Sequence, residues 1–123
     1  MEFYIRPCRI DDAGAIYELN KNSLGYHYPP ENTRQKICRA LKNRSTFITV
    51  AVCGDHVIGY IHAVDYDVLY APPMKDILAL AVNEEYRRFG VGRALLQAVE
   101  NWAMESGAGG IRLVSSSLPN RGA

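Results

Sequence analysis

The sequence predicts one mixed α/β domain with the element order β-α-α-β-β-β-α-β. The chain has 123 residues, of which 48% are hydrophobic, so it has the length and apolar content of one small packed domain. Runs rich in β-branched residues alternate with segments whose apolar residues recur at helical spacing. No internal repeat or low-complexity tract divides the chain, so we expect residues 1–123 to form a single domain.

The N-terminal segment is predicted to contain a short strand and a helix. Residues 3–6 are typical of a strand, which Pro7 is expected to end because proline has no backbone N–H to donate. Asp11 and Asp12 favour a helix start, since carboxylates accept hydrogen bonds from the free N–H groups of a first turn. The apolar spacing that follows predicts a helix over 11–22.

A loop, a second helix and a β-hairpin are predicted next. Residues 24–30 are aromatic and are interrupted by glycine and proline, so we expect a loop there. Apolar spacing predicts a helix over 31–43. Residues 47–53 and 57–64 both favour strands, and the glycine turn between them predicts that they pair as a hairpin.

The remaining segments are predicted to form a strand, a helix and a further strand. Residues 66–73 are expected to be a loop, and the apolar run over 76–82 predicts a largely buried strand. A helix is predicted from near Val91 to the residue before Gly107, because glycine commonly ends a helix. A fifth strand is predicted over 111–115.

The composition argues against several classes of protein. With 14 basic and 13 acidic residues, the net charge of +1 gives no general attraction to nucleic acid or to an anionic membrane. Cys8, Cys38 and Cys53 are odd in number and contain no CxxC pair, so we expect neither a metal site nor a disulfide framework. There is no signal peptide and no run approaching the ~18 apolar residues of a membrane span, so a cytoplasmic location is expected.

The turn from Arg87 to Arg93 carries the clearest functional signal. Gly90 and Gly92 let the backbone approach a ligand without obstruction by Cβ, and the free N–H groups of a first helical turn attract anions. Arg87, Arg88 and Arg93 can add charge-assisted hydrogen bonds. We therefore predict an anion site. The alternative is a turn that serves only tight packing, with its arginines in solvent.

Two common nucleotide-binding motifs are absent from this turn. The P-loop pattern GxxxxGK[ST] does not occur, and Leu95 stands where the dinucleotide fingerprint requires a third glycine. No acidic residue lies about 20 residues beyond Gly90 to hold a ribose. Nucleotide hydrolysis and NAD chemistry are therefore not favoured.

Residues 80–96, LAVNEEYRRFGVGRALL, resemble the central motif of the GNAT superfamily, the acetyl-CoA-dependent N-acyltransferases. The family signature is Arg or Gln, two residues, Gly, one residue, and Gly or Ala. Arg87, Gly90 and Gly92 match it. The hairpin at residues 57–60 and the element order are similar too, over essentially the whole chain. The resemblance implies a GNAT-like mixed central sheet with flanking helices.

The resemblance also implies acetyl-CoA as co-substrate and assigns residues to it. Backbone amides of residues 88–93 would bind the pyrophosphate, and the segment 80–82, freed from its neighbour by a bulge, would face the pantetheine arm. The Leu80 N–H would donate to the thioester oxygen. Asn120 is similar to a family asparagine that contacts the cofactor, and its alternative role is that of a turn residue after Pro119. The implied cofactor-binding residues are Leu80, Ala81, Val82, Arg87, Arg88, Phe89, Gly90, Val91, Gly92, Arg93 and Asn120.

Asp76 is similar in placement to a carboxylate that some family members use as a general base through water. Strand alternation predicts that Asp76 and Leu80 share a face about 13 Å apart, which requires a water relay. The alternative for Asp76 is an ordinary charge at a strand edge. In the family, loops such as those carrying Tyr26–Tyr28, Tyr66 and Tyr70 shape the acceptor pocket, and the alternative is local aromatic packing.

The family normally continues beyond the fifth strand with an Asn-initiated helix and two more strands. The present sequence ends at residues 120–123, where that helix would begin. The resemblance therefore implies a domain that is truncated at its C-terminus and lacks the usual last helix and two strands. This leaves the fifth strand with an unpaired edge, which we expect a second copy to cover in a homodimer.

The leading prediction is an N-acetyltransferase that transfers the acetyl group of acetyl-CoA to a primary amine by direct attack. The acceptor would be a small-molecule or peptide amine. One alternative is a catalytically impaired CoA-binding or interaction module, because the chain is shortened. Another is a nucleic-acid-binding domain that uses the arginine cluster, which the near-neutral net charge disfavours.

Overall fold

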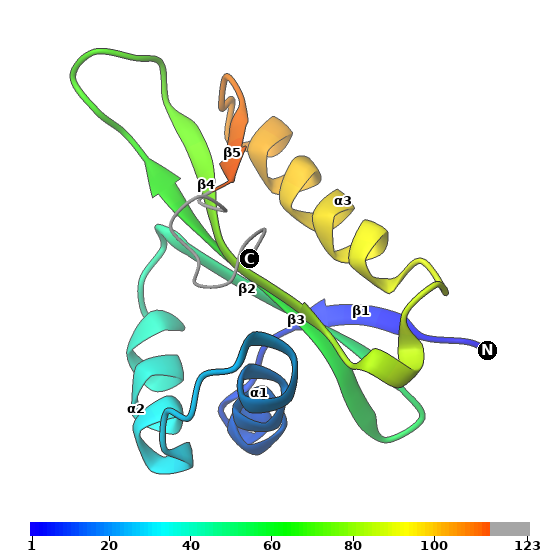
Figure 1. The fold of residues 1–123 in the computed structure, drawn as a ribbon. Helices are drawn as coiled ribbons and strands as arrows, with labels where there is room; N and C mark the ends of the chain where they lie inside the picture. Colours follow the sequence, from blue (N-terminus) through cyan, green and yellow to red (C-terminus); the bar gives the residue numbers. More distant parts are fainter. Residues whose placement is uncertain (114–123) are drawn as a thin grey trace.

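A mixed sheet of five strands forms the centre of residues 1–113, the part of the chain that the computed structural model describes (Figure 1). The strands lie side by side in the order in which they occur in the sequence. Neighbours among the first four are antiparallel, and the fifth runs parallel to the fourth. The strands are β1 (Tyr4–Pro7), β2 (Thr46–Cys53), β3 (His56–Tyr66), β4 (Met74–Val82) and β5 (Ile111–Leu113).

Helices cover both faces of this sheet. α1 (Ala13–Leu19) and α2 (Pro30–Ala40) lie on one face, and α3 (Val91–Glu105) lies on the other (Figure 1). Each face has its own apolar core, one around Ile16 and Ile37 and the other around Leu95 and Val99. The predicted mixed α/β fold is confirmed. Within residues 1–113, no helix is both long enough and apolar enough to cross a membrane.

The helix predicted over 11–22 consists of three consecutive pieces. A 3-10 turn, η1 (Ile10–Asp12), precedes α1, and a π-helical turn, η2 (Asn20–Leu24), follows it. Gly25 ends the run with a φ of 79°, a left-handed conformation that glycine adopts without strain. The Asp12 side chain does not cap α1. Its carboxylate is engaged by Arg6 and by a preceding backbone N–H instead.

The other predicted elements differ from the structure mainly at their ends. β1 includes Pro7, which an edge strand tolerates because only one side of the strand is paired. α2 ends at Ala40 and not at residue 43, while β3 extends two residues beyond the predicted 57–64, to Tyr66. β5 is described as far as Leu113, and the last two residues of the predicted strand lie outside the described part of the chain.

β4 contains a bulge that changes the face on which its side chains lie. Ala63 of β3 pairs with Ile77, but the adjacent His62 pairs with Ala79, so Leu78 is an extra residue on β4. Ile77 packs in the core under α3, whereas Ala79 packs against the core under α1 and α2. The alternation of side chains is therefore reversed at Leu78.

This bulge shows that the prediction of a shared face for Asp76 and Leu80 is wrong. Lys75 lies 3.8 Å from the ring centroid of Trp102 on α3, so the next residue, Asp76, faces α1 and α2. Leu80 follows Ala79 and faces the α3 side. Four residues of regular strand would have kept the two on one face, and the single inserted residue separates them.

Candidate functional site

A cleft of about 360 Å³ lies where β4 leads into the turn before α3. Leu80, Ala81 and Val82 line it from the strand. Arg87, Arg88, Gly90, Val91 and Gly92 line it from the turn and the start of the helix. The structure thus brings these predicted cofactor residues together around one cleft. Phe89 and Arg93 are not among its lining residues, and the Asn120 prediction lies outside the described residues.

The start of α3 presents unpaired backbone donors to this cleft. Gly90 precedes the helix with a φ of 82°, and no side chain caps the first turn. The first intrahelical bond runs from the Ala94 N–H to the Gly90 carbonyl at 3.0 Å, so the N–H groups of the three preceding residues lack a helical partner. A Cβ built at Gly92 would have only Val82 Cγ2 near it, at 3.9 Å. The cleft floor is therefore open to an anion, which the helix dipole attracts.

The two arginines of the turn are held in defined conformations. Arg87 Nε donates to the Val82 carbonyl oxygen at 3.3 Å, which ties the side chain to the end of β4. Arg88 has a φ of 76° and is the only non-glycine residue with a positive φ among residues 1–113. The left-handed region costs a residue with a Cβ about 1–2 kcal/mol, so the turn stores strain at the cleft.

Two residues of β4 direct their backbone N–H and C=O groups away from β3. The Asn83 N–H donates to the Ile58 carbonyl at 2.8 Å, and antiparallel pairs alternate between bonded and non-bonded positions. With the register that pairs Leu80 with Ile61 and Val82 with Gly59, the N–H and C=O groups of Leu80 and Val82 point outward. Those of Ala81 point toward β3. Within the predicted segment 80–82, Leu80 and Val82 thus direct their backbone groups away from β3, and the Val82 carbonyl accepts hydrogen bonds from the Arg87 and Ser23 side chains.

Ser23 is part of the site although no sequence motif pointed to it. It lies in η2, lines the cleft, and its Oγ donates to the outward-pointing Val82 carbonyl at 3.2 Å. The contact joins residues 59 positions apart. Only the fold brings the turn after α1 to the end of β4, so a local motif could not have found this residue.

Asp76 lies apart from the residues that line this cleft, in the buried part of β4. Among the described residues its carboxylate makes one hydrogen bond, in which Oδ2 accepts from Arg112 Nη1 at 3.2 Å. Oδ1 is buried and has no hydrogen-bond partner among the described residues. Arg112 also lies 4.1 Å from the ring centroid of Tyr66, whose hydroxyl is 3.1 Å from that of Tyr70. This last hydrogen bond raises the pKa of Tyr66.

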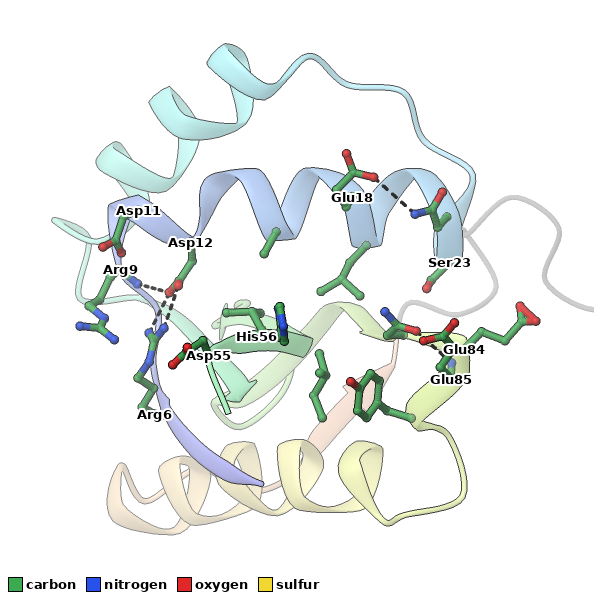
Figure 2. A pocket seen from close by; sticks show the side chains of 17 residues that line it. Arg6, Arg9, Asp11, Asp12, Glu18, Ser23, Asp55, His56, Glu84 and Glu85 are labelled. Carbon is green, nitrogen blue, oxygen red and sulfur yellow. Dashed lines mark hydrogen bonds and ion pairs between the residues drawn. The ribbon is translucent and has the colours of Figure 1, made fainter. Parts of the chain in front are cut away.

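A larger hollow of about 990 Å³ lies on the α1 side of the sheet, beside the turn between β2 and β3 (Figure 2). Ser23 belongs to its wall and to that of the first cleft. Most of the charged side chains around it are carboxylates, as Figure 2 shows: Asp11, Asp12, Glu18, Asp55, Glu84 and Glu85. Negative charge repels phosphate, so the smaller cleft is the better anion site despite its size.

One of these carboxylates is committed to an ion pair. The two oxygens of Asp12 accept hydrogen bonds from the two terminal nitrogens of Arg6, each at 2.8 Å, and the Arg9 N–H donates at 2.7 Å (Figure 2). Burial by itself raises the pKa of Asp12, but these hydrogen bonds and the positive charge of Arg6 outweigh it and lower the pKa below its usual value.

The aromatic loop between α1 and α2 borders a separate small cavity of about 140 Å³. Tyr28 lines it from the loop and His62 from β3. Burial lowers the pKa of His62, so its ring is neutral at neutral pH. Within residues 1–113, no group of three or more His, Cys, Asp or Glu side chains is placed to hold a metal ion.

Comparison with known proteins gives one family and a set of similar folds. A family model described as "Acetyltransferase (GNAT) family" matches residues 13–123. An N-alpha-acetyltransferase of Sulfurisphaera tokodaii is 31% identical over 104 residues, which cover 79% of this chain and 60% of that protein. The chain spans about 60% of the length of the curated relatives that it matches.

Two solved structures illustrate the similarity of fold. The aminoglycoside antibiotic 6'-N-acetyltransferase AAC(6')-Ih from Acinetobacter baumannii has a TM-score of 0.82 at 19% identity, covering 98% of this chain and 83% of that one. The aminoglycoside N-acetyltransferase AAC(6')-Iy in complex with CoA has a TM-score of 0.79 at 19% identity, covering 91% and 76%. At these identities the likeness concerns the fold alone.

Proposed function

The chain belongs to the GNAT family of acetyltransferases, and on that premise we propose that it transfers the acetyl group of acetyl-CoA to the nitrogen of a primary amine by direct attack. The observation that carries the proposal is the cleft at the end of β4. There the uncapped start of α3 and the outward-pointing backbone groups of Leu80 and Val82 on β4 border the same cleft. A long ligand with an anionic middle and an amide-containing arm fits this combination.

The residues of the cleft would hold this co-substrate at two places. The pyrophosphate would accept hydrogen bonds from the free N–H groups at the start of α3, with Arg87 and Arg88 adding positive charge. The pantetheine arm would lie along β4, where the outward Val82 N–H and the outward Leu80 C=O can pair with its amides. The Leu80 N–H would then donate to the thioester oxygen and stabilise the charge that grows there.

Acetyl-CoA supplies the acetyl group as a thioester. The lone pair of the neutral amine forms the C–N bond, the C–S bond breaks with its electron pair on sulfur, and the nitrogen loses one proton while the sulfur gains one. Asp76 would accept the amine proton through a relay of waters, because it lies on the other face of the sheet from Leu80 and four residues with a bulge separate the two. The unpartnered Oδ1 of Asp76 is the oxygen available for that relay.

The names of the matching relatives suggest which class of acceptor amine to screen first. Those from Sulfurisphaera tokodaii and Saccharolobus solfataricus are named N-alpha-acetyltransferases, so the α-amine of a peptide is the first class to screen. The structurally similar aminoglycoside acetyltransferases share only the fold, so small-molecule amines come second.

Calorimetric titration of acetyl-CoA into the protein tests the cofactor cleft. Gly92→Glu is the informative variant, because an added side chain meets open space and a carboxylate in a first helical turn does not harm the helix. The same change at Gly90 would add backbone strain at its φ of 82°. Gln97→Glu adds the same charge on the exposed side of α3, outside the cleft, and serves as the matched control.

We expect wild type and Gln97→Glu to bind, and Gly92→Glu to lose binding while remaining folded. Release of free CoA thiol is then measured with peptide and small-molecule amines, comparing wild type with Asp76→Asn. Binding without turnover of any amine would favour the CoA-binding module. Equal binding of acetyl-CoA by wild type, Gly92→Glu and Gln97→Glu would place the cofactor elsewhere and refute the proposed site.

A further inference from the structure

The Asp76 carboxylate is held by one oxygen only. Asp76 is 7% exposed, its Oδ2 accepts from Arg112 Nη1 at 3.2 Å, and its buried Oδ1 has no partner among residues 1–113. Buried carboxylate oxygens are normally hydrogen-bonded, so an unpaired buried oxygen such as Oδ1 is unusual and indicates a functional role. From this geometry we infer that Arg112 is a positioning residue for Asp76. Its guanidinium binds Oδ2 and thereby orients Oδ1 toward the water that carries the proton. The inference rests on the proposed function.

The parallel pairing of β4 and β5 creates this contact. Asp76 lies directly opposite Arg112, and the two neighbouring pairs, Lys75 with Ile111 and Ile77 with Leu113, lie on either side of it. Lys75 faces Trp102 on the α3 side, so its neighbour Asp76 lies on the opposite face. The register thus brings a cation to the acid on the face where the acid lies.

Tyr66 keeps the guanidinium of Arg112 in place. Tyr66 lies two residues beyond Val64, the β3 partner of Asp76, and therefore on the same face of the sheet as the acid. Its ring centroid is 4.1 Å from Arg112 Cζ, and its hydroxyl is hydrogen-bonded to Tyr70. A planar guanidinium can stack on a ring and donate from its edge at once, which the ammonium of a lysine cannot do.

Two pairs of variants separate charge from geometry. Arg112→Lys keeps the positive charge but loses the planar, stacked donor, whereas Arg112→Met removes the charge as well. Tyr66→Leu removes the ring beneath the guanidinium, whereas Tyr66→Phe keeps the ring and removes only the hydroxyl bonded to Tyr70. The inference predicts a larger effect of Tyr66→Leu than of Tyr66→Phe.

The first measurement does not depend on activity. The three-bond couplings between Hα and the two Hβ protons of Asp76 report, by NMR, whether its side chain occupies one rotamer. We expect the pair of couplings of a single rotamer in wild type and Tyr66→Phe, and averaged couplings in Arg112→Met and Tyr66→Leu. A single unchanged rotamer in Arg112→Met would overturn the inference, whatever the protein catalyses.

The second measurement asks what the positioning serves. With an amine that wild type acetylates, Arg112→Met should lower kcat by about 10- to 100-fold through misplacement of the base, leaving KM for acetyl-CoA unchanged. Arg112→Lys should retain an intermediate rate. In the Asp76→Asn background, Arg112→Met should have no further effect on kcat, because the group that it positions is already gone.

The outcomes distinguish the two ideas. Additive losses in the double variant would mean that Arg112 does not act through Asp76, and the inference would fail while the proposed function stands. Acetyl-CoA binding without turnover of any amine would refute the proposed function. The Hα–Hβ couplings of Asp76 would still decide whether Arg112 positions its carboxylate.

Discussion

Replacing Gly59 with alanine tests how closely α3 is seated on the sheet. Gly59 lies in β3, directly beneath the start of α3. A methyl group added there would lie 3.0 Å from the Ala81 carbonyl oxygen, 3.2 Å from Val91 Cγ1 and 3.3 Å from Leu95 Cδ1. The carbonyl belongs to the neighbouring strand and cannot turn aside, and the Val91 and Leu95 side chains of α3 must move away by a few tenths of an ångström.

The magnitude follows from two opposing terms. Overfilling a packed core costs about 1–3 kcal/mol. Replacing glycine in a strand returns about 0.5–1 kcal/mol because the unfolded chain loses less freedom on folding. The free energy of unfolding should therefore fall by roughly 0–2.5 kcal/mol, with a midpoint of about 1.2 kcal/mol, at which Tm falls by about 5 °C for a chain of this size.

Urea denaturation followed by the fluorescence of the single tryptophan measures this change. Trp102 lies on α3 and is stacked on Phe47 of β2, with ring centroids 4.8 Å apart, so its signal reports separation of the helix from the sheet. The matched control is Gly14→Ala in α1, where an added Cβ meets nothing within 4 Å. That variant should be more stable than wild type, by about 0.5–1 kcal/mol.

The change at Gly59 should also weaken acetyl-CoA binding at the proposed site, because Val91 begins α3 and lines that cleft. A Gly59→Ala protein as stable as Gly14→Ala would refute the reasoning, since it would mean that α3 adjusts without cost.

Three further predictions concern separate features. Arg88→Gly should be more stable than Arg88→Ala by about 1 kcal/mol in urea denaturation, because both remove the charge but only glycine relieves the φ of 76°; equal stabilities would show that the turn is unstrained. Asp12→Asn should cost about 2–4 kcal/mol, because Arg6 loses its buried partner. Since folding lowers the pKa of Asp12 from 3.8, the advantage of wild type over this variant should be complete above about pH 5 and shrink as the pH falls below 3.8; an advantage that is constant down to pH 2 would contradict it. Burial raises the pKa of Cys8 to about 12, so at pH 8 a thiol reagent should modify the other two cysteines readily and Cys8 only as the protein unfolds; three equally fast thiols would show that Cys8 is accessible.

The turn before α3 could be predicted because its chemistry is local. The two glycines, the arginines beside them and the apolar spacing of the helix all lie within one stretch of sequence, and the structure gathers most of these residues around one cleft. The element order and the hairpin were predictable for the same reason, since each depends on turn residues and periodicity within a short window.

The features that could not be predicted depend on distant parts of the chain. The bulge at Leu78 is defined by the register of β4 against β3, and no glycine or proline in β4 indicates its position in the sequence. Its effect is large, because it moves Asp76 and Leu80 to opposite faces. The contacts of Ser23 with Val82 and of Arg112 with Asp76 likewise join residues 59 and 36 positions apart.

The order of the strands bears on how the protein folds. β2, β3 and β4 follow one another both in the sequence and in the sheet, so their pairing closes only short loops. Two helices separate β1 from β2 in the sequence, and α3 separates β4 from β5, so these two strand pairs close longer loops. We therefore expect the three-stranded meander to consolidate first during refolding. Because the proposed acetyl-CoA site is formed by both β4 and the start of α3, the refolding chain should acquire its central sheet before it can bind acetyl-CoA there.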